Sequence, residues 1–189
     1  MLAKEYVNNL FEVLSMVEIR DIEGRRYDLD DASGLMVDFI KGHAQDGGKV
    51  MFIGNGGSAA IASHCGIDFW KNGGIKSMCF NDGPSLTCIG NDFGYEYVFE
   101  KPIKLFAERG DILVAISSSG KSPNILLAVE AAREKGCRVI TLSGFSENNP
   151  LRSKGHFNIY VGSQSYGVVE LSHQIVLHMV LDLIMGKER

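Results

Sequence analysis

Short apolar runs alternate with helix-like stretches along most of the chain, and this alternation limits the fold more than any other feature. Five runs read as strands: KVMFIG, IKSMCF, DILVAIS, RVITLSG and HFNIYV. Continuous apolar strands separated by helices are typical of a parallel sheet whose two faces are both covered. The sequence therefore predicts an α/β fold built on a five-stranded parallel sheet.

The segments that flank this core are predicted to be mainly helical. Residues 2–17 carry apolar side chains at helical spacing, and residues 31–44 form a second predicted helix. The charged run EIRDIEGRRYDLDD between them is predicted to be an exposed connection. The last helix, residues 167–185, is too apolar for a free surface helix and is predicted to pack on the core or on another subunit. A chain of 189 residues fits one domain, with residues 1–48 as an N-terminal helical segment and residues 49–189 as the α/β core.

Composition argues against several classes of protein. A formal charge of −4 and a pI near 5.7 disfavour binding to nucleic acid or to an anionic membrane, since both need a basic face. We expect no membrane span and no signal peptide, because the N-terminal helix lacks the apolar region and cleavage site of a leader. The four cysteines show no C-x-x-C spacing, which predicts reduced thiols in a cytoplasmic protein.

Two polar turns follow predicted strands and lead into predicted helices. The first is GNGGS, residues 54–58, and the second is SSSGKS, residues 117–122. Helix N-termini offer unpaired N–H groups, glycine allows close approach of the backbone, and serine hydroxyls add donors. Because ligands bind at the carboxyl ends of parallel strands, the two turns predict a cradle for a phosphate group.

Two other interpretations of these turns stay open at this point. Serines that precede a helix are often ordinary helix caps. The first turn also fits the dinucleotide-binding pattern G-x-G-x-x-A, with Asp82 further along the chain. That pattern leaves the second turn unexplained, and the chain has no room for the substrate domain of a dehydrogenase.

Histidine and acidic side chains recur at helical spacing on two predicted helices. His64 and Asp68 are four residues apart, which places them on one face. On the last helix, Glu170 and His178 are separated by about 80° around the axis. Two imidazoles and two carboxylates are a suitable ligand set for Zn²⁺ or another divalent metal. His173 is interpreted as a core or interface residue, the commoner role of a histidine in an apolar helix.

Four stretches together resemble the sugar isomerase (SIS) domain family and, within it, the phosphoheptose isomerases. They are GNGGSAA with the following His64, LTCIGNDFGYEYVF, GDILVAISSSGKSPNILLAVEAAREKG, and the helix that carries His178. The resemblance covers nearly the whole chain. It implies a three-layer, flavodoxin-like fold and a homotetramer with active sites between subunits. It also implies conversion of D-sedoheptulose 7-phosphate to D-glycero-D-manno-heptose 7-phosphate, which supplies heptose for lipopolysaccharide, capsule or other surface glycans.

The resemblance also implies roles for individual residues. The predicted substrate-binding residues are Asn55, Gly56, Gly57, Ser58, Asp92, Ser117, Ser118, Ser119, Ser122 and Glu170. The predicted ligands of Zn²⁺ or another divalent metal are His64, Asp68, Glu170 and His178. The predicted catalytic residues are Asp68 and His178.

The chain departs from the family's pattern in the predicted site. Asp68 stands where the family usually has Glu, and Glu170 where it usually has Gln. Gly167 and Val168 replace an Asp-Arg pair. The predicted metal site survives these changes and becomes more anionic, whereas the sugar side of the pocket differs. The sequence therefore constrains the reaction class more than the substrate.

In the predicted reaction, Asp68 or Glu170 removes a carbon-bound proton, with Asp68 favoured by its position in the family, and His178 exchanges the oxygen-bound proton. Two other functions stay open. One is an SIS domain without catalysis, acting as a phosphosugar sensor or as an assembly factor in the initiation of DNA replication. The other is an isomerase of a different phosphosugar. Relatives of the assembly type lack the histidine at the position of His178, which favours an enzyme.

Overall fold

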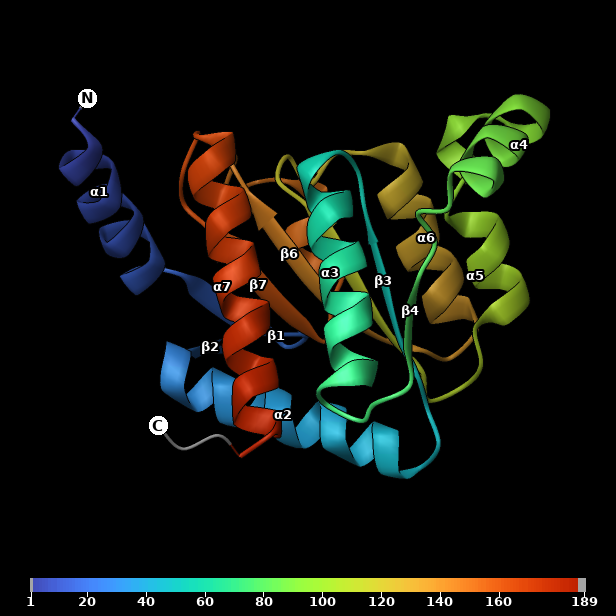
Figure 1. Cartoon of the computed structure of the whole chain (residues 1–189), viewed down its shortest axis with the longest axis horizontal. Helices are drawn as coiled ribbons and strands as arrows, with labels where there is room; N and C mark the ends of the chain where they lie inside the picture. Colours follow the sequence, from blue (N-terminus) through green and yellow to red (C-terminus); the bar gives the residue numbers. More distant parts are fainter. Residues whose placement is uncertain (1, 187–189) are drawn as a thin grey trace.

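A seven-stranded sheet forms the centre of the computed structural model, which describes residues 2–186 (Figure 1). Five of the strands are parallel, in the spatial order β4 (Ser77–Cys79), β3 (Val50–Gly54), β5 (Ile112–Ser117), β6 (Arg138–Gly144) and β7 (Phe157–Val161). This is the flavodoxin-like order of a doubly wound sheet, which reverses direction between β3 and β5. The five predicted strands and the predicted fold class are confirmed.

Two antiparallel strands extend the sheet beyond β7, where the sequence predicted an exposed connection. β1 (Glu18–Asp21) pairs with β7, and β2 (Arg26–Tyr27) pairs with β1. The turn between them, residues 22–25, is exposed as predicted, but the two strands were missed, because charged side chains of the hairpin form ion pairs. One oxygen of Glu18 contacts the guanidinium groups of Arg20 at 3.1 Å, Arg26 at 3.2 Å and Arg152 at 2.8 Å.

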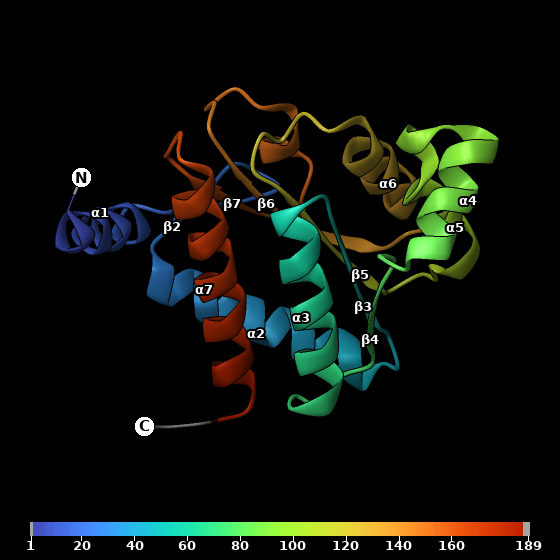
Figure 2. The same ribbon diagram turned by 45° about the horizontal axis from the view of Figure 1, so that its top comes forward.

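Helices cover both faces of the sheet, as Figures 1 and 2 show. The helices are α1 (Ala3–Ser15), α2 (Leu29–Gln45), α3 (Gly57–Lys71), α4 (Gly83–Phe93), α5 (Glu100–Phe106), α6 (Pro123–Glu134) and α7 (Tyr166–Ile184), with short 3₁₀ turns η1 (Tyr95–Tyr97) and η2 (Pro150–Ser153). Helices α2, α3 and α7 pack on one face, and α5 and α6 pack on the other. The predicted helices 31–44 and 167–185 are α2 and α7, whereas α4 and α5 were not predicted.

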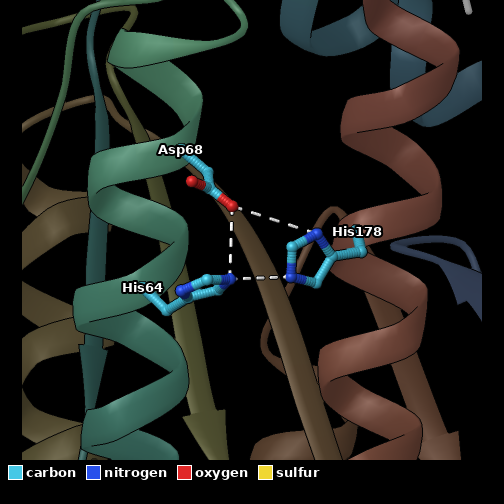
Figure 3. A group of neighbouring side chains, drawn as sticks. All are labelled: His64, Asp68 and His178. Carbon is cyan, nitrogen blue, oxygen red and sulfur yellow. Dashed lines mark hydrogen bonds and ion pairs between the residues drawn. The ribbon is translucent and has the colours of Figure 1, made fainter.

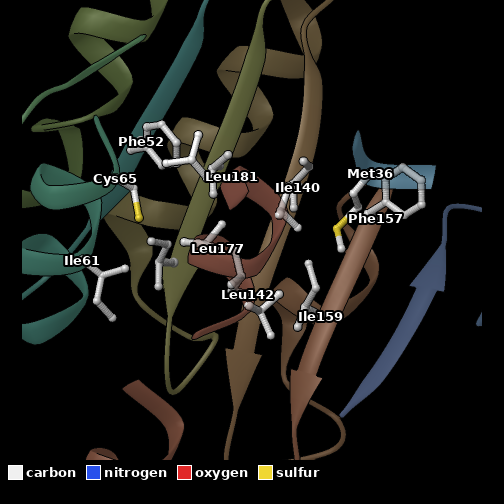
Figure 4. Packing of buried hydrophobic residues seen from close by; sticks show 14 of the residues in the cluster. Met36, Phe52, Ile61, Cys65, Ile140, Leu142, Phe157, Ile159, Leu177 and Leu181 are labelled. Carbon is white, nitrogen blue, oxygen red and sulfur yellow. The ribbon is translucent and has the colours of Figure 1, made fainter. Parts of the chain in front are cut away.

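Alternate side chains of each central strand enter two separate hydrophobic cores. In β5, Val114 belongs to the core under α2, α3 and α7, and its neighbours Leu113 and Ala115 belong to the core under α5 and α6. Figure 4 shows the first core, where Leu177 and Leu181 of α7 pack among side chains of the sheet. Because strands that are buried on both faces carry apolar residues at every position, their runs were visible in the sequence.

Helix α7 is long and apolar enough to cross a membrane by length and composition, with a mean hydropathy of 1.4. Half of its most apolar stretch is buried inside the fold, and α7 packs beside α3 and across α2 (Figures 1 and 2). Its composition therefore suits a helix that covers the core. The four cysteines are free thiols, as predicted.

Candidate active site

The two polar turns lie side by side because β3 and β5 are neighbours in the sheet. The last residue of β3, Gly54, is in register with Ile116, one residue before the end of β5. A pocket of about 130 Å³ opens between the turns. Its lining contains seven of the ten predicted substrate-binding residues together with Tyr166: Asn55, Ser58, Ser117, Ser118, Ser119, Ser122 and Glu170. The pocket occupies the topological switch point, where doubly wound sheets bind ligands.

Glycine is required in the first turn for two separate reasons. Gly56 has φ +55° and ψ −122°, a backbone conformation that side chains strongly disfavour. A Cβ on Gly54 would lie 2.5 Å from the backbone of Ser58. The bare backbone therefore lets the chain turn sharply from β3 into α3.

The three helices that begin at this edge have no side-chain cap. Gly56, Ser122 and Ser165 precede α3, α6 and α7, and none of their side chains bonds to the helix N-terminus. In contrast, Asp28 caps α2 and Asp82 caps α4. Within residues 2–186, the N–H groups of Gly57 and Ser58 in α3 and of Asn124 in α6 have no hydrogen-bond partner and are left for another one. The geometry does not support the ordinary-cap interpretation of Ser122, and Asp82 serves as a cap at the start of α4.

The serine turn contains a buried hydroxyl group without a partner. Ser117 and Ser118 are both 5% exposed. The hydroxyl of Ser117 lies 3.4 Å from that of Ser122, whereas Oγ of Ser118 has no hydrogen-bond partner. Buried polar groups are rarely left unpaired in folded proteins. The unpaired Ser118 hydroxyl beside an uncapped helix therefore indicates a polar ligand.

Asn55 is held by side chains that the sequence did not single out. Its amide forms a reciprocal pair with the amide of Asn124, at 3.0 Å and 2.9 Å, and its Oδ1 also accepts from the hydroxyl of Tyr95 at 3.2 Å. One N–H of Asn55 remains for a ligand. The pair joins the first turn to the start of α6, so it sets the spacing between the two turns.

Glu170 and Gly57 are in direct contact across the α3–α7 interface. A Cβ on Gly57 would fall on the carboxylate of Glu170, so only glycine allows this approach. The carboxylate therefore lies against the first turn of α3, where the helix dipole favours negative charge. It places a negative charge in the pocket lining.

His64, Asp68 and His178 converge between α3 and α7, as Figure 3 shows. Nε2 of His64 lies 2.9 Å from Nε2 of His178 and 3.2 Å from Oδ2 of Asp68. Nδ1 of His178 is 4.0 Å from the same carboxylate oxygen. The other oxygen of Asp68 accepts from Nδ2 of Asn72 at 3.1 Å, which orients the carboxylate.

The donor atoms of these three residues suit a divalent metal, since they all lie within 4.8 Å of one another. A tetrahedral Zn²⁺ with Zn–N bonds of about 2.0–2.1 Å would separate two imidazole nitrogens by about 3.3 Å. The neighbouring thiol of Cys65 is a poorer ligand, because burial and the charge of Asp68 raise its pKa to about 12. The structure thus brings together three of the four predicted metal ligands.

The fourth predicted ligand, Glu170, lies nearer the starts of α3 and α7. It precedes His178 by eight residues, on the order of 12 Å of helix rise, and lines the serine pocket. Ser58 and His64 are separated by on the order of 9 Å along α3 in the same way. The serine pocket and the histidine cluster therefore lie at different heights along the same two helices. The role of Glu170 in the serine pocket is distinct from its predicted role in the cluster. The role of Glu170 as a metal ligand stays a prediction.

Two further sequence predictions concern side chains outside the pocket and the cluster. Asp92 is exposed in the last turn of α4, where it lies 3.7 Å from Cys88, and it does not line the pocket. His173 is fully buried with its Nε2 3.2 Å from the carbonyl of Ser143, and burial lowers its pKa to about 4. It is a core residue, as predicted. Tyr166, Asn72 and Asn124 were missed because no sequence pattern marks them.

A doubly wound sheet with phosphate-type turns at its switch point and a His–Asp–His group beside them defines the class of protein. The chain belongs to the SIS domain family, whose model matches residues 5–144. It is 35% identical over 162 residues to the phosphoheptose isomerase of Citrifermentans bemidjiense, with 82% of each chain covered. The phosphoheptose isomerase of Proteus mirabilis is likewise 35% identical over 162 residues.

Solved structures agree with this assignment. The phosphoheptose isomerase of Neisseria gonorrhoeae superposes with a TM-score of 0.80 at 26% identity, over 97% of this chain and 96% of that chain. The enzyme of Francisella tularensis gives a TM-score of 0.79 at 24% identity, over 99% and 100% of the two chains, and supports the fold alone.

Proposed function

We propose that this protein is an aldose–ketose isomerase that converts D-sedoheptulose 7-phosphate to D-glycero-D-manno-heptose 7-phosphate for surface-glycan heptose synthesis. The observation that carries the proposal is that the serine pocket and the cluster of His64, Asp68 and His178 lie along the same two helices, α3 and α7. The named relatives with 35% identity act as phosphoheptose isomerases.

The serine pocket suits the phosphate group. Ser117, Ser118, Ser119 and Ser122 supply hydroxyls, and α6, whose preceding Ser122 does not cap it, supplies the N–H of Asn124. Asn55 and Ser58 of the first turn would contact the sugar, and Gly56 and Gly57 keep the backbone close to it. Binding energy at this remote end would position the reacting carbons. A contact between Asp92 and the sugar remains a prediction.

The distance between the serine pocket and the histidine cluster suits a long sugar phosphate. The two are separated by on the order of 10 Å of helix rise. In D-sedoheptulose 7-phosphate, the reacting C1–C2 unit and the phosphate are at opposite ends of a seven-carbon chain. An extended chain of that length would place C1 and C2 beside Asp68 and His178.

In the proposed reaction, Asp68 removes a proton from C1 of the ketose, and the electron pair forms the C1–C2 double bond of an enediol. His178 gives a proton to the C2 oxygen and then takes one from the C1 hydroxyl, while Asp68 returns its proton to C2. Asn72 holds Asp68 in the orientation for this transfer. Glu170 is the alternative base that the sequence left open.

His64, Asp68 and His178 would hold Zn²⁺ or another divalent metal, with Glu170 as the predicted fourth ligand. When bound there, the metal supplies Lewis-acid polarisation of the sugar carbonyl.

The remaining predictions form part of the same proposal. Residues 1–189 form one SIS domain, with residues 1–48 as its N-terminal segment, in a cytoplasmic protein. We propose a homotetramer with active sites between subunits. Exposed apolar side chains on α3 and α7 support a subunit contact along these helices: Ile67 at 51%, Leu171 at 43% and Ile175 at 38%.

The test is turnover of D-sedoheptulose 7-phosphate, followed by the appearance of the aldose, in the wild type, Asp68→Asn and His178→Ala. We expect losses of about 10²–10⁴-fold in kcat for each variant. Asp38→Asn is the matched control, since Asp38 is exposed on α2. Metal content of the purified wild type and His64→Ala, measured by mass spectrometry, reports on the metal separately from activity.

Full activity in Asp68→Asn and His178→Ala would overturn the assignment of the catalytic residues. Two other outcomes separate the competing functions. Tight binding of phosphosugars without turnover would identify a sensor or assembly domain. Turnover of a different ketose phosphate in a substrate panel would identify another isomerase.

A further inference from the structure

A second polar cavity lies at the amino ends of the parallel strands, whereas the candidate active site lies at their carboxyl ends. It has a volume of about 360 Å³ and is formed by the C-terminal end of α2 and the loops that precede β3, β5 and β6. Its lining residues are His43, Asp46, Gly48, Arg109, Gly110, Gly136 and Arg138. In Figure 1, it lies where the end of α2 leads into the start of β3.

Glycine turns bring the walls of this cavity close together. A Cβ on Gly48 would lie 2.9 Å from the carbonyl oxygen of His43 and 3.0 Å from that of Gly110. Gly136 has φ +78°, and its Cβ would lie 3.4 Å from Cγ of Arg109. The side chain of Arg109 therefore passes over Gly136, two residues before Arg138. The loops before β5 and β6 thus place two guanidinium groups on one cavity.

The two arginines of this cavity have no acidic partner. Within residues 2–186, neither Arg109 nor Arg138 has a carboxylate within 4.0 Å. Asp111, two residues after Arg109, is buried and bound by other groups. It accepts from Nζ of Lys49 at 2.5 Å, from the amide of Lys49 at 2.9 Å and from the amide of Glu108 at 2.8 Å.

The cavity is therefore positively charged, since Asp46 is the one acid in its lining against two arginines. The neighbouring histidines respond to this charge. Burial is the first cause that lowers the pKa of His43, and the charge of Arg138 is the second. The same two causes lower the pKa of His156. A positive cavity with two uncommitted guanidinium groups favours an anion.

We propose that this cavity is a second binding site for a phosphate-type oxyanion, distinct from the serine turn. Guanidinium groups bind phosphate oxygens through two parallel hydrogen bonds, and two of them face this cavity. Its volume is within the range of small-ligand pockets. The six residues of β5 separate it from the serine turn by on the order of 20 Å, so one phosphate group cannot occupy both sites.

Equilibrium dialysis with radiolabelled inorganic phosphate at low ionic strength tests the proposal. Four proteins are compared: the wild type, Arg109→Gln/Arg138→Gln, Ser118→Ala/Ser119→Ala, and Lys135→Gln. Lys135 is the matched control, because it is exposed next to Gly136 but does not line the cavity. The wild type is expected to bind two phosphates per chain. In the arginine variant, the dissociation constant of the phosphate at the arginine cavity is expected to rise by at least about tenfold, while the other phosphate stays bound.

The serine variant separates this inference from the proposed function. It is expected to keep the phosphate bound at the arginine cavity, with an affinity that falls as salt is added. Loss of all phosphate binding in the serine variant, or equal binding by the arginine variant and the wild type, would overturn the inference. If the arginine variant loses all binding while the serine variant binds like the wild type, the arginine site stands and the proposed phosphate cradle fails.

Discussion

Replacing Asn124 by alanine removes the link between the two turns of the candidate active site. Asn124 is 2% exposed and makes three hydrogen bonds through its side chain. It donates to Oδ1 of Asn55 at 2.9 Å, accepts from Nδ2 of Asn55 at 3.0 Å, and accepts from the amide of Ile125 at 3.0 Å. In the variant, the side-chain amide of Asn55 would lose both bonds to Asn124 and keep its bond from the hydroxyl of Tyr95.

The loss of stability follows from this count of bonds. At a net contribution of about 1 kcal/mol for each hydrogen bond, Asn124→Ala should lower the free energy of unfolding by about 3 kcal/mol. For a chain of this size, the melting temperature should fall by about 6–12 °C. Asn124→Asp keeps both acceptor contacts, but it sets a carboxylate oxygen against Oδ1 of Asn55 and buries a negative charge, so its melting temperature should fall at least as far.

The assays are thermal unfolding at a fixed protein concentration and steady-state kinetics with the sugar phosphate. If the amide pair sets the spacing of the turns, KM should rise in both variants more than kcat falls, and the metal content should stay that of the wild type. Asn148→Ala is the matched control, since Asn148 is exposed and its side chain makes no hydrogen bond to residues 2–186. A melting temperature within 1 °C of the wild type, with unchanged KM, would refute the reasoning.

Three further predictions concern other parts of the same framework. Because burial lowers the pKa of His173 to about 4, the unfolded chain binds a proton between roughly pH 6.5 and 4 that the folded chain does not. The free energy of unfolding should therefore decrease as the pH is lowered through that window. Urea unfolding of His173→Gln should show a smaller decrease, and parallel curves for the two proteins would contradict this. Gly57→Ala should cost about 1–3 kcal/mol of stability through its clash with Glu170, and a double-mutant cycle with Glu170→Ala should recover part of that loss; simple additivity would exclude the contact. Asn72→Ala should lower kcat without a change in melting temperature, because it releases one oxygen of Asp68 at an exposed position; an unchanged kcat would remove Asn72 from the proposed mechanism.

The strands and the phosphate-type turns were readable from the sequence because they depend on local patterns. A strand buried on both faces must be apolar at every position, and a helix that begins at a ligand site must follow a strand through a small, polar turn. For the same reason, the i, i+4 pair His64 and Asp68 could be placed on one helix face. The charged hairpin of β1 and β2 was misjudged because its ion pairs reach Arg152, far along the chain.

The order of the strands and the height at which helices meet were decided only by the tertiary structure. The adjacency of β3 and β5 brings Asn55 to Asn124, 69 residues away, and the packing of α3 on α7 brings His64 to His178, 114 residues away. Helical spacing predicted that Glu170 and His178 point in similar directions from α7. It could not show how far along α3 each of them lies, so the contact of Glu170 with the start of α3 and that of His178 with His64 were not predicted. Local residue patterns determined the five buried strands and the polar turns that follow two of them. Packing between elements distant in the chain decided which of those groups share one site, because contacts of that kind depend on side-chain fit that no local pattern records.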